Sequence, residues 1–177
     1  PPIHDRGLDP QKWYADYVET YIERDVRSLL NIQDLSVFQL FLKMCGARCG
    51  QLINLSGLAS DCGITHNTAK EWISILEASY ILFRVVPYFN NLGKRLVKTP
   101  KLYFYDSGLA TYLLGIKTPE QLSVHPHRGA IFETFVASEI MKSAYNSGET
   151  PSLYFWRDRS GNEIDFLVDR GSDLLPI

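Results

Sequence analysis

Apolar residues at helical spacing fill the first part of the chain. Asp9 and Pro10 form a helix start, because aspartate caps helices and proline suits their first turn. This helix is predicted to continue to about residue 30 with a charged outer face, and we interpret residues 1–34 as a connector helix. A second helix, over residues 35–44, is so strongly apolar that it must be largely buried.

Two more helices and a hairpin are expected to follow. A helix over residues 55–62 and a helix over residues 65–78 flank a glycine turn. Strands are predicted at residues 81–87 and 102–105, with a turn between them. Three helices followed by a hairpin are typical of a winged helix, which we assign to residues 35–116.

Polar and basic side chains on the third helix and the hairpin are candidates for contact with a nucleic-acid backbone. Lysine and arginine neutralise phosphates, and the hairpin carries basic residues with no acid among them. The alternative is a solvated hairpin on a packing module. The candidate DNA-binding residues are His66, Asn67, Lys70, Lys94, Arg95, Lys98 and Lys101.

A connection containing proline and histidine, residues 117–128, separates this part from a last domain over residues 117–177. Asp106 precedes a short helix and is expected to cap it rather than to bind a ligand. His125 and His127 lack a metal-ligand spacing, so we interpret them as loop residues.

The next helix, predicted over residues 129–144, carries two acids at or inside its apolar face. At 100° per residue Glu139 falls in the middle of that face and Glu133 at its edge. A buried carboxylate needs a cation, a hydrogen-bond donor or a metal. One open alternative is that both glutamates only pair with arginines, Glu139 with Arg157. The predicted apolar stripe consists of Ile131, Phe132, Phe135, Val136 and Ile140.

The end of the chain has the pattern of a β-meander with a second pair of acids. Strands are predicted at residues 154–157, at 163–168 and from residue 174. Two carboxylates on one face of an apolar strand again require a partner. With a period of two, one face carries Ile164, Phe166 and Val168, and the other carries Glu163, Asp165 and Leu167.

Short motifs in this part resemble those of a known family. The motifs are G-A-I-F-E at 129–133, F-W-R at 155–157, E-I-D-F at 163–166 and P-I at 176–177. They resemble the PD-(D/E)xK nuclease-like fold, and more closely the C-terminal part (domain of unknown function 4143) of bacterial and archaeal AAA-type ATPases. In that family the last motif continues as Pro-x-Glu-x-Lys, so its Glu and Lys are expected directly after Ile177.

The resemblance implies an α+β fold in which a connector helix and a winged helix precede a truncated PD-(D/E)xK restriction-endonuclease-like lobe. It implies that Glu133 and Asp165 hold Mg²⁺, with Glu163 as a further catalytic residue. It also implies DNA and the ATPase module of the same chain as partners. Without the last motif we expect this piece to be inactive. The alternative is a non-catalytic scaffold that binds DNA or a protein.

Composition indicates how large the core can be, and the distribution of charge indicates which ligands each segment suits. The 177 residues are 45% hydrophobic, which allows one large or two small cores, and the net charge is −2. Residues 35–105 carry 8 basic and 3 acidic side chains, whereas residues 106–177 carry 6 and 10. A basic segment suits phosphate and an acidic segment suits cations.

Further sequence features concern the cell compartment and the extent of the chain. No signal peptide, lipidation motif or run long enough to span a bilayer is present, and a cytoplasmic setting is expected. We interpret Cys45, Cys49 and Cys62 as small buried hydrophobes. Gly93 and Lys94 are not part of a phosphate-binding loop, so this piece is not expected to hydrolyse ATP. A start at Pro1 and an end within a strand predict a piece of a longer protein.

Overall fold

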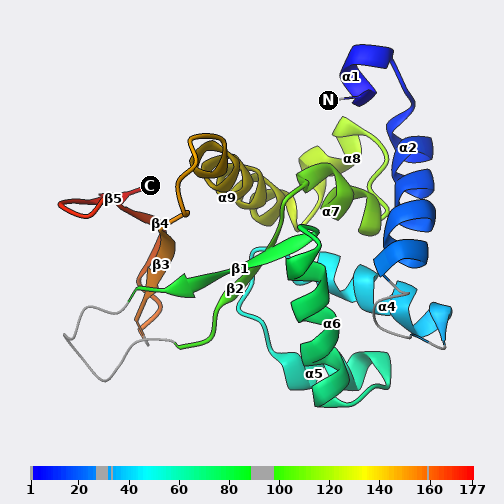
Figure 1. The fold of residues 1–177 in the computed structure, drawn as a ribbon, viewed down its shortest axis with the longest axis horizontal. Helices are drawn as coiled ribbons and strands as arrows, with labels where there is room; N and C mark the ends of the chain where they lie inside the picture. Colours follow the sequence, from blue (N-terminus) through cyan, green and yellow to red (C-terminus); the bar gives the residue numbers. More distant parts are fainter. Residues whose placement is uncertain (1, 27–31, 33, 89–97, 159) are drawn as a thin grey trace.

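A mixed β-sheet organises the fold. The computed structural model describes residues 1–177 except residues 1, 27–31, 33, 89–97 and 159. Its strands are β1 (Leu82–Pro87), β2 (Lys101–Phe104), β3 (Leu153–Arg157), β4 (Glu163–Asp169) and β5 (Leu174–Pro176). Their order in the sheet is β2-β1-β3-β4-β5 (Figure 1). β1 and β3 are parallel and the other neighbours are antiparallel, so the predicted hairpin and the predicted meander share one sheet.

The helices of the described residues lie on both sides of β1 and β2 (Figure 1). The helices of the first half are α1 (Pro2–Arg6), α2 (Pro10–Tyr17), the π-helical η1 (Val18–Val26), α4 (Leu35–Gly46), α5 (Leu55–Cys62) and α6 (His66–Ala78). Those of the second half are α7 (Ser107–Leu113), α8 (Pro119–Val124) and α9 (Arg128–Asn146). The predicted helices and strands are thus confirmed in kind and order, and the mixed composition agrees with the α+β prediction.

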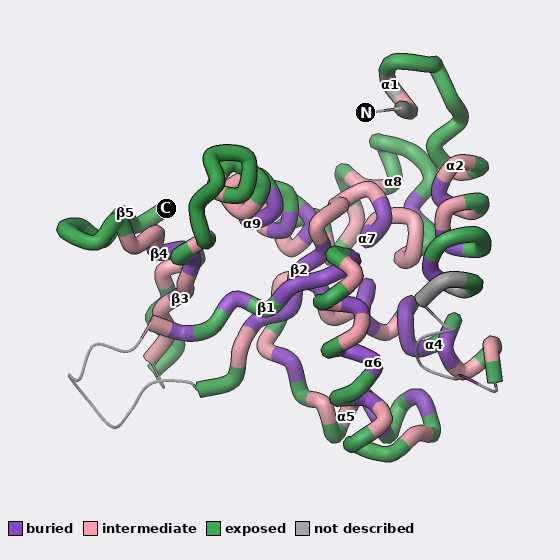
Figure 2. The backbone as a smooth tube through the Cα atoms, viewed as in Figure 1, coloured by how far each residue is buried: buried purple, intermediate pink, exposed green. Residues whose placement is uncertain are grey.

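Strand β2 is buried on both faces, because its side chains alternate between two apolar clusters. Leu102 and Phe104 belong to a larger cluster with the helices of the first half. Tyr103 belongs to a smaller cluster between the sheet and α9, together with Phe155 and Phe166. Figure 2 shows buried residues along β1, β2 and α4, while β5 and much of α8 are exposed.

Side-chain caps begin several helices and explain why the sequence signals located them. Thr65 accepts a hydrogen bond from the backbone N–H of Thr68 and caps α6, as predicted. Gly63 ends α5 with φ of 66°, a left-handed conformation that favours glycine. Asp106 caps α7 by accepting from Gly108 and Leu109, which confirms it as a cap.

Three expectations for the helices are corrected. The first long helix changes from α-helical to π-helical geometry at Val18, and α1 and α8 were not predicted. In α9, Phe132 and Phe135 are 67% and 49% exposed and do not belong to the buried stripe. Ala137, with the partly buried Val136 and Ile140 of the predicted stripe, packs in the cluster between the sheet and α9, and Ile131 packs against the helices of the first half. The buried positions of α9 are Ile131, Thr134, Ala137 and Ser138.

Two further observations concern the cysteines and membranes. Cys45, Cys49 and Cys62 are free and buried, which confirms their interpretation as small hydrophobes. Burial raises the pKa of Cys49 to about 11, so its thiol stays protonated. In the part of the chain that the structure describes, no helix has the length and apolar character needed to cross a membrane.

Candidate functional site

A β-bulge in β4 determines which way the acids of the meander point. In the pairing with β3, Tyr154 lies opposite Leu167 but Trp156 lies opposite Ile164, so β4 holds one extra residue. Asp165 and Phe166 therefore share one position on the partner strand. A bulge interrupts the period of two, and the side chains on its two sides change faces.

The bulge corrects the predicted faces of β4. Glu163 pairs with Arg157, which lies on the same face of β3 as the buried Phe155. Phe166 also packs in that cluster, against Tyr103. Glu163 and Phe166 therefore lie on the face that α9 covers, instead of on opposite faces.

The side chain of Lys101 stands between the acids. It lies at the start of β2, and only 5% of it is exposed. Its Nζ is 2.8 Å from Oε1 of Glu133 and 2.5 Å from Oε1 of Glu163. Oδ1 of Asp165 lies 4.0 Å away. One ammonium thus links a helix and a strand that are distant in the sequence.

Further side chains hold the same carboxylates. Tyr103 follows Lys101 by two residues on β2, and its hydroxyl donates to the Glu133 oxygen that also accepts from Lys101. Arg157 Nη1 is 3.5 Å from Oε2 of Glu163. The ammonium of Lys101 lies over the Phe155 ring, with Nζ 5.5 Å from the ring centroid. Glu133 and Glu163 therefore each have two partners.

Burial and the neighbouring carboxylates shift the pKa of Lys101 in opposite directions. Desolvation by itself lowers the pKa of Lys101, but hydrogen bonds to Glu133 and Glu163 outweigh it, and the pKa lies above its ordinary value. For Tyr103, burial and the neighbouring Glu133 carboxylate both raise the pKa of the phenol. At neutral pH the site thus contains a charged ammonium and a neutral phenol that donates a hydrogen bond.

The cluster opens to solvent on the side of Asp165, whose side chain is 62% exposed. A hollow of about 400 Å³ lies there. Gly50 at its wall has φ of +72°, and a Cβ at this position would meet Cβ of Ala130 at 3.0 Å, so only glycine fits there easily. The residues that line the hollow are Gly50, Gln51, Leu52, Lys101, Glu133, Arg157, Glu163 and Asp165.

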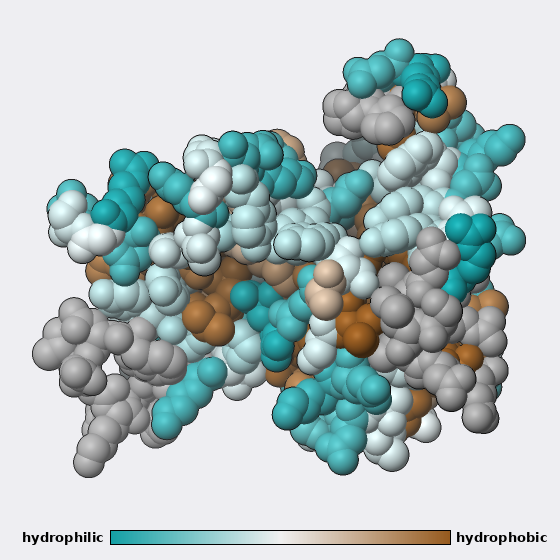
Figure 3. Space-filling view, viewed as in Figure 1, coloured by the Kyte–Doolittle hydropathy of each residue, from teal (hydrophilic) through white to brown (hydrophobic). Residues whose placement is uncertain are grey.

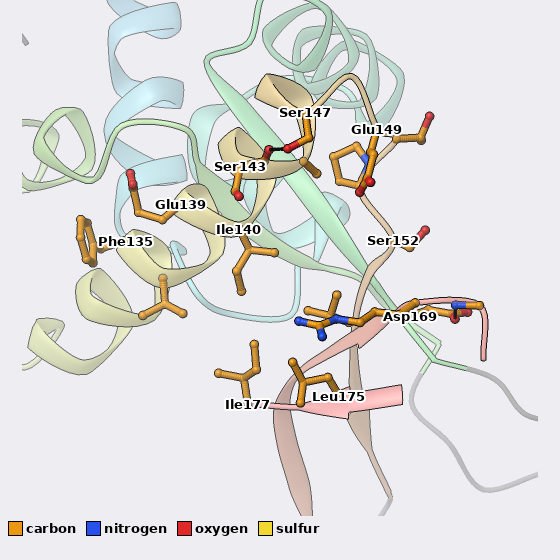
Figure 4. Close-up of a pocket in the computed structure, with 17 residues that line it drawn as sticks. Phe135, Glu139, Ile140, Ser143, Ser147, Glu149, Ser152, Asp169, Leu175 and Ile177 are labelled. Carbon is orange, nitrogen blue, oxygen red and sulfur yellow. Dashed lines mark hydrogen bonds between the residues drawn. The ribbon is translucent and has the colours of Figure 1, made fainter. Parts of the chain in front are cut away.

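Glu139 lies apart from this cluster. Its carboxylate pairs with Lys142 at 3.0 Å, and more than half of its side chain is exposed. It lines a different hollow, of about 1040 Å³, between α9 and the β4–β5 hairpin (Figure 4). The predicted pairing of Glu139 with Arg157 is wrong, because Arg157 reaches Glu163 instead.

The structure separates the other predicted site residues into groups. His66, Asn67 and Lys70 are exposed near the start of α6, and Lys98 is exposed before β2. Lys94 and Arg95 lie outside the described residues. Lys101, predicted as a phosphate contact, lies in the carboxylate cluster instead, because both faces of β2 are covered.

Sequence reasoning missed the roles of Lys101, Tyr103 and Arg157 in this cluster. One signal was present: Lys101 begins the otherwise apolar strand K-L-Y-F-Y, and Tyr103 comes two residues later on the same face. A lysine inside such a strand needs carboxylates nearby.

The comparisons with known proteins divide the chain at the connection before α9. The profile of a family described as "Domain of unknown function (DUF8612)" matches residues 1–120, more than half of the chain. The chain belongs to the DUF8612 family. Residues 128–177 match a second profile, "Domain of unknown function (DUF4143)", which confirms this part of the resemblance found in the sequence. Lys101 and Tyr103 come from the DUF8612 segment (residues 1–120), and Glu133, Glu163 and Asp165 come from the DUF4143 segment (residues 128–177).

Two curated relatives match the DUF8612 chain over nearly its full length. They are the "Uncharacterized protein Mb2031c" of Mycobacterium bovis and the "Uncharacterized protein Rv2008c" of Mycobacterium tuberculosis. Each is 30% identical over 161 residues, which is 91% of this chain and 36% of the relative. The chain therefore spans little more than a third of the length of these relatives. No solved structure matches it significantly.

Proposed function

We propose that the DUF8612 chain is the nucleic-acid-associated part of an AAA-type ATPase, in which a winged helix contacts DNA and the carboxylate cluster belongs to a Mg²⁺-dependent nuclease-like lobe. The observation that carries this proposal is the convergence of Glu133, Glu163 and Asp165 at one open hollow. The resemblance of their motifs to the PD-(D/E)xK fold supports it.

The donor set fits a hard divalent cation. Mg²⁺ prefers carboxylate oxygens, and the three acids come from a long helix and from a strand inside the sheet. Glu133 and Asp165 would hold the ion together with Glu163, and a phosphate would approach from the solvent side, where Asp165 is exposed. Such an ion, when bound, lowers the pKa of a water molecule and neutralises charge on the phosphate.

The chain's own side chains position these acids. Tyr103 and Lys101 hold Glu133, and Arg157 lies beside Glu163. Within the described residues no group of three or more His, Cys, Asp and Glu side chains is arranged to hold a metal as it stands. In the described cluster, the ammonium of Lys101 takes the central place between the carboxylates.

The arrangement of the DUF8612 segment supports the DNA-contacting role. Helices α4, α5 and α6 precede the antiparallel pair β1–β2, in the order of a winged helix. The segment after α4 runs along the outer edge of β2, where Leu102 N–H donates to Gln51 O at 3.0 Å. His66 of α6 and Thr99 of the hairpin line one hollow, of about 470 Å³. Figure 3 shows mainly hydrophilic residues over α5 and α6.

A second function, a non-catalytic scaffold that binds DNA or a protein, is favoured by one observation. Lys101 already neutralises Glu133 and Glu163, as the cation of a purely structural ion cluster does. In this case the hollow beside Asp165 has no substrate.

Cleavage of DNA by the full-length protein tests the first function against the second. We expect cleavage that requires Mg²⁺ or Mn²⁺ and falls about 100-fold or more in Asp165→Asn. Glu139→Gln is the matched control, because Glu139 is an acid on α9 outside the cluster. Absence of cleavage with either metal, while DNA binding persists, establishes the scaffold instead.

A further inference from the structure

The ammonium at the centre of the carboxylate cluster is supplied by a different segment from the carboxylates. Lys101 lies in the DUF8612 segment, whereas Glu133, Glu163 and Asp165 lie in the DUF4143 segment. β2 carries Lys101 into the site because β1 pairs with β2 on one side and with β3 on the other. The site is therefore composite, and neither segment forms it alone.

We propose that Lys101 is a tethered cation that competes with a divalent metal ion for the carboxylates of Glu133 and Glu163. This inference rests on the proposed function, because it concerns the metal of the same site. The inference adds that Lys101, a residue of the DUF8612 segment, holds the metal-free site together and occupies the place that the metal would take.

Distances make the competition direct. The ammonium takes one oxygen of Glu133 at 2.8 Å and one oxygen of Glu163 at 2.5 Å. An ion such as Mg²⁺ approaches carboxylate oxygens to about 2.0–2.1 Å. Two cations cannot share the space between these two oxygens, so the ammonium has to withdraw when the metal enters.

The surroundings allow the ammonium to withdraw without dispersing the acids. Tyr103 still donates to Glu133, and Arg157 still lies beside Glu163. The open hollow beside Asp165 gives the ammonium a place to move to.

Binding of Mn²⁺ to the full-length protein, followed by the electron paramagnetic resonance of the free ion, tests the proposal. We expect Lys101→Met to bind Mn²⁺ about tenfold more tightly or better, since a unit charge a few ångströms from the metal is removed. Lys12→Met is the matched control, because Lys12 is exposed on the same segment and belongs to neither proposed site, and it should bind Mn²⁺ as the wild type does. Equal or weaker binding by Lys101→Met overturns the proposal.

A second measurement uses the wild type and does not depend on the folding of a variant. Acylation of lysine amines, located by mass spectrometry, should be slow at Lys101 without metal, because only 5% of its side chain is exposed. Saturating Mn²⁺ should increase labelling of Lys101 at least about threefold relative to Lys98, as expected when a charge-paired amine is released. Labelling that Mn²⁺ leaves unchanged contradicts the displacement.

The two proposals fail in different ways. Tighter Mn²⁺ binding by Lys101→Met without any DNA cleavage upholds the tethered cation and removes the nuclease function. Absence of Mn²⁺ binding in both the wild type and Lys101→Met removes the metal site, and the competition with it.

Discussion

Phe38 and Lys101 are both almost completely buried, but Phe38 lies in an apolar cluster and Lys101 lies among carboxylates. Phe38 packs edge-on against Trp72, with ring centroids 5.2 Å apart, in the cluster of the first helices. The side chain of Lys101 lies between Glu133 and Glu163, on the side of the sheet that α9 covers. The helical cluster is held by apolar burial, and the layer between the sheet and α9 is held in part by charge.

The comparison shows where the fold uses its residues for something other than stability. Apolar residues of similar size often stabilise a protein as well as a buried ion cluster or better, because charges lose hydration on burial. A cluster of three acids and two cations is therefore a weak stabiliser for its volume. Its position beside an open hollow supports the proposed role in binding a cation and a phosphate.

The largest effect on stability is expected in the helical cluster. Phe38→Ala removes a ring that is 0% exposed and touches Trp72. It should lower the free energy of unfolding by about 3–5 kcal/mol, measured by urea denaturation. The loss should be independent of salt and of pH near neutrality, because no charge is involved. A loss below about 1 kcal/mol is incompatible with a closely packed helical cluster.

A smaller loss, with a different signature, is expected in the charged layer. Glu163→Gln removes a carboxylate 2.5 Å from Lys101 Nζ, while Glu133 remains as a partner. The free energy of unfolding should fall by about 1.5–3 kcal/mol at pH 7. Glu139→Gln, the exposed control, should change it by less than about 1 kcal/mol.

At alkaline pH the contribution of the charged layer to stability should fall, whereas that of the apolar layer should not. The pKa of Lys101 is raised in the folded state, so its stabilising contribution is complete below the unfolded value of about 10.4 and is lost as the pH rises through the folded value. The difference between wild type and Glu163→Gln should therefore shrink above about pH 10.4, since a neutral amine gains little from the carboxylate. The difference between wild type and Phe38→Ala should stay the same. If the difference in the free energy of unfolding between wild type and Glu163→Gln stays constant up to pH 11, the effect of Glu163 is not one of charge.

The two layers also differ in how far the sequence predicts them. The helices around Phe38 follow from apolar periodicity and from caps such as Thr65 and Asp106, which act within a few residues. The face of Glu163 does not follow, because the extra residue in β4 breaks the period of two on which the prediction depends. The acids themselves were recognised from their types and motifs.

Lys101 shows a second reason why prediction from the sequence is incomplete. From the sequence, Lys101 was predicted to contact DNA together with Lys98, because both lie in a basic stretch. Its real partners are 32 and 62 residues further along the chain, and the packing of α9 against β2 and the parallel pairing of β1 with β3 bring them together. Periodicity and local charge contain no information on such a pairing.

The smallest effect on stability is expected for basic residues that belong to neither layer. Lys70 on α6 and Lys98 before β2 are exposed, so replacing both with alanine should change the free energy of unfolding by less than about 0.5 kcal/mol. If they contact DNA phosphates, the slope of log affinity against log salt concentration should fall by about one unit for each lost contact. Lys12→Ala, an exposed lysine on α2, is the control and should leave the slope unchanged. Fluorescence anisotropy of labelled duplex DNA over a salt series gives the slope. An unaltered slope in the double variant would assign DNA contact to another surface and leave the α6–hairpin face as a site for a protein partner.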